Sequence, residues 1–104
     1  MGLTSTAAAA SGSVKPTGGV AKRAQGSTST AFYTVPSGKY FVGFVGSARD
    51  TAGININGSK MFYNDDSGDE GNNSHGPLTF YAGTTFAPGN SNYYSWVAGV
   101  EYDL

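Results

Sequence analysis

The chain has no cysteine among its 104 residues, which excludes disulfide bonds, a thiolate nucleophile and a cysteine zinc site. Charged residues are also scarce, at 12%. No apolar run is long enough to cross a bilayer, so we expect no membrane partner. The first positive charge, Lys15, follows the alanines of residues 7–10 instead of preceding them, which is not the pattern of a secretion signal. We therefore expect a protein that is not exported through a signal peptide.

Charge and aromatic residues are unevenly distributed along the chain. Residues 1–30 carry Lys15, Lys22 and Arg23 and no acid, for a net charge of +3, whereas residues 31–104 carry three basic and seven acidic residues, for a net charge of −4. All six Phe, seven Tyr and the single Trp lie at or after Phe32. This division predicts an extended, low-complexity N-terminal arm over 1–30 and a folded domain over 31–104. Since the arm lacks core-forming residues, we expect another protein to hold it in place.

Residues 31–104 have the pattern of short strands separated by turns. Strands are predicted at 31–35, 39–48, 77–83, 84–90 and 93–102, and Asn57-Gly58 predicts a hairpin within 53–63. The segment 39–48 has apolar residues on both of its faces, which is typical of a central strand or of a strand at a subunit contact. Six or seven strands in so short a segment predict an all-β fold, a compact antiparallel β-sandwich or a jelly-roll-like barrel.

Residues 93–102 show a regular alternation. Tyr94, Trp96, Ala98 and Val100 share one face, and Tyr93, Ser95, Val97, Gly99 and Glu101 share the other. A body this small buries too little surface to be more than marginally stable alone, and it has no cysteine to staple it. We therefore expect a homo-oligomer, specifically a homotrimer, with Tyr93, Tyr94 and Trp96 as candidates for its interface or for a ligand contact.

The acidic segment 64–77 is the first place to look for a metal or catalytic site, because it holds four of the seven acids and the only histidine. Counting a calcium loop from Asp65 puts Glu70 where glycine is required and Gly76 where the closing glutamate is required. We interpret the segment as a turn-rich loop, with a weak cation site as the alternative, and expect no metal and no cofactor. His75 is the sole histidine and cannot form a multi-histidine site, so we expect it to be structural or exposed. Glycoside hydrolysis by paired carboxylates stays open, since the sequence cannot place two acids across a sugar.

Four segments resemble small β-sandwich modules of tailed-bacteriophage virion proteins. They are "TVPSGKYFVGFVGS", "GININGSKMF", "GPLTFYAGTTFAPG" and the terminal "VAGVEYDL". Such modules occur in capsid decoration (cement) proteins and in fibre tips, usually as trimers. The resemblance implies a structural role in the virion, with no enzymatic activity.

Fibre tips normally follow a shaft or a coiled coil, and this chain has neither heptads nor shaft repeats. We therefore expect a capsid decoration protein, made in the host cytoplasm and located on the capsid surface of the virion. Its arm, with Lys15, Lys22 and Arg23, would bind the major capsid protein. Three charges form only a weak footprint for DNA, so nucleic acid is not an expected partner. The alternative is a trimeric fibre-tip or receptor-binding module that contacts a host glycan through loop 64–77 and through Tyr93, Tyr94 and Trp96.

Overall fold

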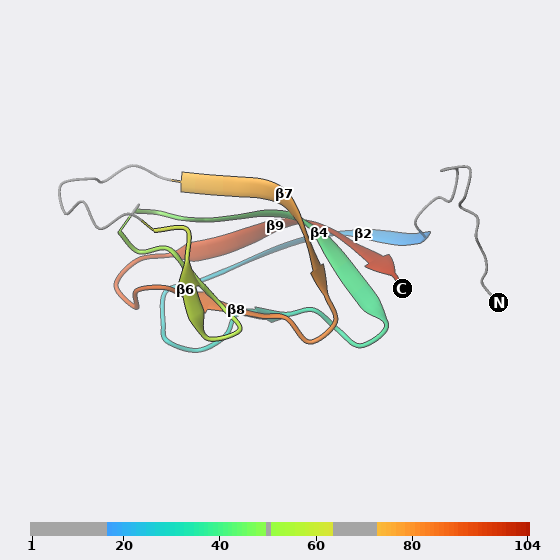
Figure 1. The fold of residues 1–104 in the computed structure, drawn as a ribbon, viewed down its shortest axis with the longest axis horizontal. Coiled ribbons are helices and arrows are strands. Elements are labelled where there is room, and N and C mark those ends of the chain that lie inside the picture. The colour runs from blue at the N-terminus through green and yellow to red at the C-terminus, as the bar shows by residue number, and fades with distance from the viewer. Residues whose placement is uncertain (1–16, 50, 64–72) are drawn as a thin grey trace.

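The computed structural model describes residues 17–49, 51–63 and 73–104 (Figure 1). These residues form two four-stranded antiparallel sheets packed face to face, which confirms the predicted all-β sandwich. They include no helix that could cross a membrane. Lys15 and the acids of the 64–72 segment lie outside the described residues.

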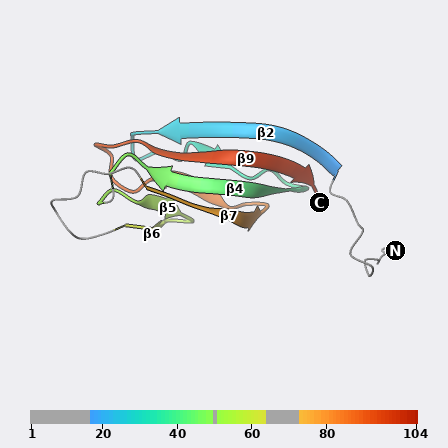
Figure 2. The same cartoon turned by 90° about the horizontal axis from the view of Figure 1, so that it is seen from above.

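The larger sheet has the strand order β2-β9-β4-β7 (Figure 2). Its strands are β2 (Thr17–Gly26), β9 (Ser95–Asp103), β4 (Lys39–Ser47) and β7 (Asn73–Tyr81). The smaller sheet has the order β3-β8-β5-β6, with β3 (Tyr33–Thr34), β8 (Thr85–Pro88), β5 (Ile54–Ile56) and β6 (Ser59–Met61). The prediction that 39–48 forms a central strand is confirmed, because β4 lies between β9 and β7.

The strand β2 corrects the predicted domain boundary. Residues 17–26 pair antiparallel with β9, from Thr17 opposite Asp103 to Gly26 opposite Ser95. The prediction of an arm over 1–30, held only by another protein, is therefore wrong for residues 17–26. The physical reason is that a β-ladder uses backbone N–H and C=O groups, which every non-proline residue supplies whatever its side chain. Residues 1–16 lie outside the described part of the chain.

The core lies between the two sheets. Its buried members are Val35, Phe41, Val45, Ile54, Phe86 and Val97. The ring of Phe41 meets that of Phe86 edge to face with centroids 6.4 Å apart. It lies over Gly43 and Gly99, which are paired across β4 and β9, and a Cβ added at Gly99 would come within 2.9 Å of Phe41 Cζ. These glycines are therefore required for the ring to lie against the sheet.

The predicted hairpin is confirmed at β5 and β6. Asn57 has φ of 52° and Gly58 has φ of 84°, the two positive values that a type I′ turn requires. The Asn57 side chain also accepts a hydrogen bond from the Thr85 backbone N–H at 2.9 Å. The turn is thus held against β8.

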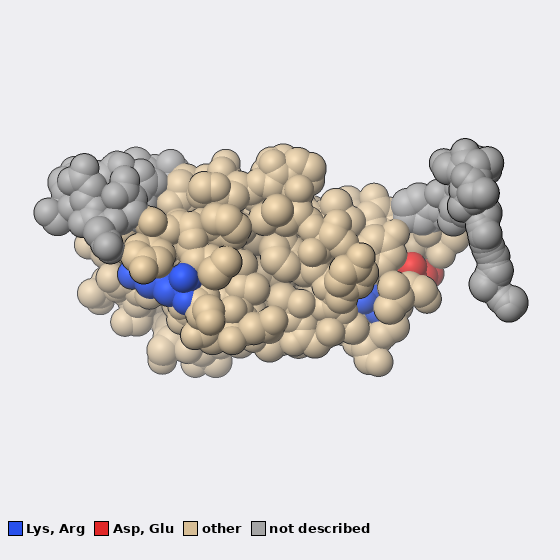
Figure 3. All heavy atoms as spheres, viewed as in Figure 1, with Lys and Arg blue, Asp and Glu red and all other residues tan. Residues whose placement is uncertain are grey.

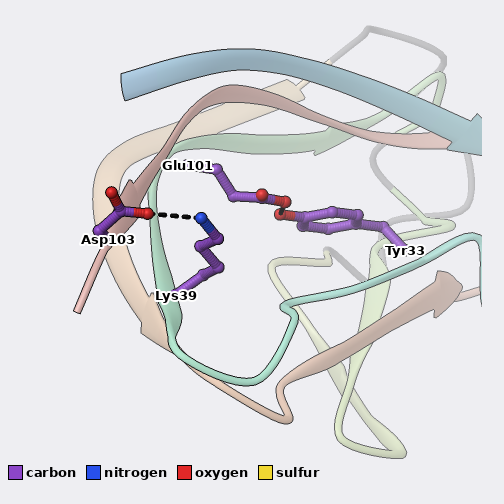
Figure 4. Close-up of polar contacts among 4 residues, drawn as sticks. All are labelled: Tyr33, Lys39, Glu101 and Asp103. Carbon is purple, nitrogen blue, oxygen red and sulfur yellow. Dashed lines mark hydrogen bonds and ion pairs between the residues drawn. The ribbon is translucent and has the colours of Figure 1, made fainter. Parts of the chain in front are cut away.

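Two polar contacts involve the C-terminal end of β9 (Figure 4). The Tyr33 hydroxyl, from the smaller sheet, donates a hydrogen bond to the buried Glu101 carboxylate at 2.5 Å. Burial raises the pKa of Tyr33 above its ordinary range, and the hydrogen bond to Glu101 and its negative charge raise it further. At the surface, Lys39 pairs with Asp103 at 2.5 Å, and this hydrogen bond is the main reason that the pKa of Lys39 is raised.

Candidate functional site

The two outer faces of the sandwich differ in chemistry. Residues paired directly across neighbouring strands share a face. On the smaller sheet Ile54 and Phe86 are buried, so the outer face consists of the alternate residues and their partners. These are Thr34, Asn55, Lys60, Thr85 and Ala87. This face is mainly polar, as expected of a sheet surface in contact with water.

The outer face of the larger sheet is mostly apolar and aromatic. Because Phe41 and Val45 of β4 are buried, Tyr40, Val42 and Phe44 lie on the outer side. The register extends this surface onto the three neighbouring strands. We name it the aromatic face and define it as Ala21, Arg23, Gln25, Tyr40, Val42, Phe44, Ser74, Thr79, Tyr81, Trp96, Ala98, Val100 and Tyr102. It contains no acid, and its one charged residue, Arg23, lies on the edge strand β2.

Large rings lie at both ends of the aromatic face. At one end Tyr40 lies between Tyr81 and Tyr102, with ring centroids 6.3 Å and 5.3 Å away. At the other end the Trp96 indole lies over Gly46, where an added Cβ would come within 2.5 Å of Trp96 Cζ2. Tyr81 is 61% exposed and Phe44 is 43% exposed, whereas Tyr40, Trp96 and Tyr102 are half-buried. On the side of the molecule that Figure 3 shows, the charged atoms of the described residues form two small, separate patches.

The structure separates the three aromatic residues predicted for an interface or ligand site. Trp96 belongs to the aromatic face. Tyr93 lies in the turn before β9, where the Arg49 guanidinium donates a hydrogen bond to its hydroxyl at 3.0 Å and stacks on its ring with Cζ 4.8 Å from the centroid. Tyr94 also precedes β9 and is 51% exposed.

The predicted capsid-binding residues Lys22 and Arg23 lie on β2, opposite Gly99 and Ala98 of β9. Both are exposed, and their side chains point to opposite faces because they are consecutive in a strand. Arg23 Nη2 donates a hydrogen bond to Gln25 Oε1 at 3.1 Å. Within the described chain no strand pairs with the second edge of β2, so these two residues flank an open row of backbone groups (Figure 2).

Of the 64–77 segment, only residues 73–77 are described, and they belong to β7. The His75 ring stacks on Phe62 with centroids 4.5 Å apart, and Phe62 itself packs against the core. This is a packing role for the histidine. Among the residues with described positions, no three His, Asp or Glu side chains gather in a group that could hold a metal ion.

Sequence reasoning missed most of the aromatic face. The signal was present in 39–48, whose apolar residues occupy both faces, but the pairing partners Tyr81 and Tyr102 lie 41 and 62 positions after Tyr40 in the sequence. The partnership of Glu101 with Tyr33 was missed for the same reason, since they are 68 positions apart.

Comparison with known proteins identifies no relative: no family model matches the chain, and no curated protein or solved structure matches it. The aromatic face and the edge of β2, which no other described strand pairs with, are therefore the features that indicate a function.

Proposed function

We propose that the protein is a non-enzymatic structural subunit of a virion, a capsid decoration protein that acts as a homotrimer and binds the major capsid protein. The observation that carries this proposal is the long basic strand β2, which is an edge strand among the described strands, beside a nearly uncharged aromatic face. Both surfaces suit contact with other protein chains. The resemblance of the body to small β-sandwich modules of phage virions points the same way.

In this proposal the major capsid protein binds along the edge of β2, and not along a free arm over 1–30. An extended peptide can add a strand to such an edge, with main-chain hydrogen bonds giving affinity and side chains giving selectivity. The opposite edge of the sheet is less suitable, because β7 contains Pro77 and a register shift opposite Gly43 and Val45. In β2 the register shift lies at the start, between Thr17 and Val20, and pairing is regular from Val20 to Gly26.

The basic pair on β2 predicts the chemistry of the added strand. Lys22 and Arg23 have no acidic neighbour within 17–26, so they favour a capsid segment that carries Asp or Glu. Lys15 remains a predicted further contact, outside the described residues. Lysine on an edge strand also discourages aggregation. A glutamate at the same position is charged as well, so replacing Lys22 by glutamate tests binding and keeps a charge on the edge.

Capsids assembled from the major capsid protein encoded with this chain provide the test. In co-sedimentation, Lys22→Glu should weaken binding by about tenfold or more, as expected for reversing one charge at a contact. The matched control is Lys60→Glu, the same change at an exposed position of β6 on the smaller sheet, which should bind like the wild type. Equal binding by both variants and the wild type would contradict attachment through β2.

A fibre tip that contacts a host glycan is the second candidate, and the exposed rings of Tyr81 and Tyr94 favour it because aromatic faces stack on sugars. Antibody labelling of intact virions in the electron microscope distinguishes the two locations. Labels over the capsid surface support decoration, and labels at fibre ends support the tip. Virions without any label would contradict both.

A further inference from the structure

We propose that the aromatic face of the larger sheet is covered by a second copy of this chain. The inference deepens the proposed function and rests on it in one respect, since it names the surface through which the subunits of the proposed homo-oligomer meet. Two such faces packed on each other close as a dimer, and a trimer requires each face to be shared between its two neighbouring copies.

The two outer faces of this small sandwich differ in a way that indicates a protein contact. The smaller sheet presents Thr34, Asn55, Lys60 and Thr85 to solvent, as a sheet in water does. The larger sheet presents tyrosine, phenylalanine, valine and tryptophan at the corresponding outer positions. Monomeric proteins rarely leave an apolar patch of several strands exposed, and such patches mark protein contacts.

Charge favours a copy of the same chain as the occupant. A self-contact is made by the same surface on both sides, so a charge buried in its centre needs an opposite charge on that same surface. The aromatic face has no acid to pair with a base, but it needs none, because its one charged residue, Arg23, lies on the edge strand. A face without acids and with one marginal base cannot select a foreign partner by charge.

Shape is also compatible with self-association. The bulky rings lie at the two ends, with Tyr40, Tyr81 and Tyr102 at one and Trp96 at the other. Smaller side chains lie between them, namely Val42, Ala98 and Val100, with Ala21 on β2, and the ring of Phe44 projects among them opposite Ala98. Offsetting two such faces places the rings of one copy against the small residues of the other, which is how packed sheets fill the space between them.

The size of the sheet is close to that of a specific contact. A nine-residue strand such as β4 is about 30 Å long and four strands are about 19 Å wide, which gives a planar footprint of about 570 Å². Projecting rings increase the accessible area above this planar value. Specific interfaces bury about 600–1,000 Å² on each partner, so this face alone approaches what a stable dimer or trimer requires.

The experiment measures the mass of the full chain in solution by light scattering or sedimentation over a range of micromolar concentrations. The monomer is 10.7 kDa, so a trimer has a mass of 3 × 10.7 = 32.1 kDa. Thr79→Glu puts a charge on the aromatic face, and Thr34→Glu puts the same charge on the outer face of the smaller sheet; both threonines are exposed on strands. Thr79→Glu should raise the dissociation constant of self-association by about tenfold or more, and Thr34→Glu should leave it within about twofold.

A wild-type chain that stays monomeric, or equal effects of the two threonine variants, would overturn the inference. A dimer would support the assignment of the face and contradict the trimer. Phe44→Glu is a second variant on the face, and far-ultraviolet circular dichroism shows whether each variant is folded. If Phe44→Glu unfolds the chain, Thr79→Glu still tests whether the aromatic face is the contact surface, because the Thr79 side chain is exposed on an edge strand. Since mass is measured without capsids, self-association and virion location can fail independently.

Discussion

The hydroxyl of Tyr33 donates a hydrogen bond to Glu101 Oε2 at 2.5 Å and thereby joins β3 of the smaller sheet to β9 of the larger one. Glu101 is only 7% exposed and faces the interior between the sheets. A buried carboxylate is costly unless a donor satisfies it, and Tyr33 supplies that donor.

Removing this donor should destabilise the fold. Tyr33→Phe leaves Glu101 without the hydroxyl, and we expect the free energy of unfolding to fall by about 1–3 kcal/mol. Urea unfolding followed by circular dichroism measures the change. Tyr63→Phe, which removes a hydroxyl from a residue that is 47% exposed, is the control and should change stability by less than about 0.5 kcal/mol. Similar losses in both variants would contradict the importance of the Tyr33–Glu101 bond.

The same pair predicts a loss of stability at alkaline pH. Burial and the hydrogen bond to Glu101 raise the pKa of Tyr33, so the folded state holds this proton more tightly than the unfolded chain, in which tyrosine titrates near about 10. The contribution is therefore complete below pH of about 10 and declines as the pH rises above it. The raised pKa of Lys39, due first to its hydrogen bond with Asp103, acts in the same direction.

Unfolding free energies measured from pH 8 upward should show this decline in the wild type and a shallower one in Tyr33→Phe. An equally steep decline in the variant would assign the alkaline sensitivity to other groups.

Gly99 should tolerate no side chain. A Cβ there would clash with the Val42 carbonyl oxygen and come within 2.5 Å of Gly43 Cα and 2.9 Å of Phe41 Cζ. Gly99→Ala should therefore destabilise the fold by about 1–3 kcal/mol through overpacking. Gly58→Ala provides the comparison, because it has φ of 84° and no atom within 4 Å of the added Cβ. Its cost of about 1–2 kcal/mol is a backbone cost alone. A smaller residue at 41 should relieve only part of the loss in Gly99→Ala, because the backbone atoms of Val42 and Gly43 stay in place, and none of the loss in Gly58→Ala. A double-mutant cycle measures this coupling.

Trp96 is the only tryptophan and lies on the aromatic face, so its fluorescence reports on the proposed self-association. Dilution of the wild type, or the Thr79→Glu substitution, should shift its emission to longer wavelength as the indole becomes solvated. Thr34→Glu should show the wild-type spectrum at the same concentration. An emission maximum that is unchanged by Thr79→Glu while the mass falls to that of a monomer would place Trp96 outside the interface.

Local patterns in the sequence predicted much of the sandwich. Asn57-Gly58 specifies its turn through the positive φ values that these residues tolerate, and the alternation around Val97 follows from one buried face. Both signals act between residues close in the chain, so they can be read without knowing the fold.

The strand β2 and the aromatic face could not be predicted in this way. The segment 17–26 has little apolar content and is ordered by backbone pairing with β9, a partner about 80 residues away that no local pattern identifies. The aromatic face depends on which strands become neighbours, so the apolar outer residues of 39–48 could not be joined to Tyr81 and Tyr102 beforehand.

The pairing of Thr17 with Asp103 also sets how the sheet would respond to mechanical tension. A pull that separates these two residues acts on an antiparallel ladder at one end, so the hydrogen bonds between β2 and β9 would break in succession. Resistance to force in this direction is thus limited to the strength of one or two bonds at a time. Gly26 and Asp103 lie at opposite ends of this ladder, so tension between them would load all of its hydrogen bonds at once, in shear. The separation of β2 from β9 would then require a much larger force.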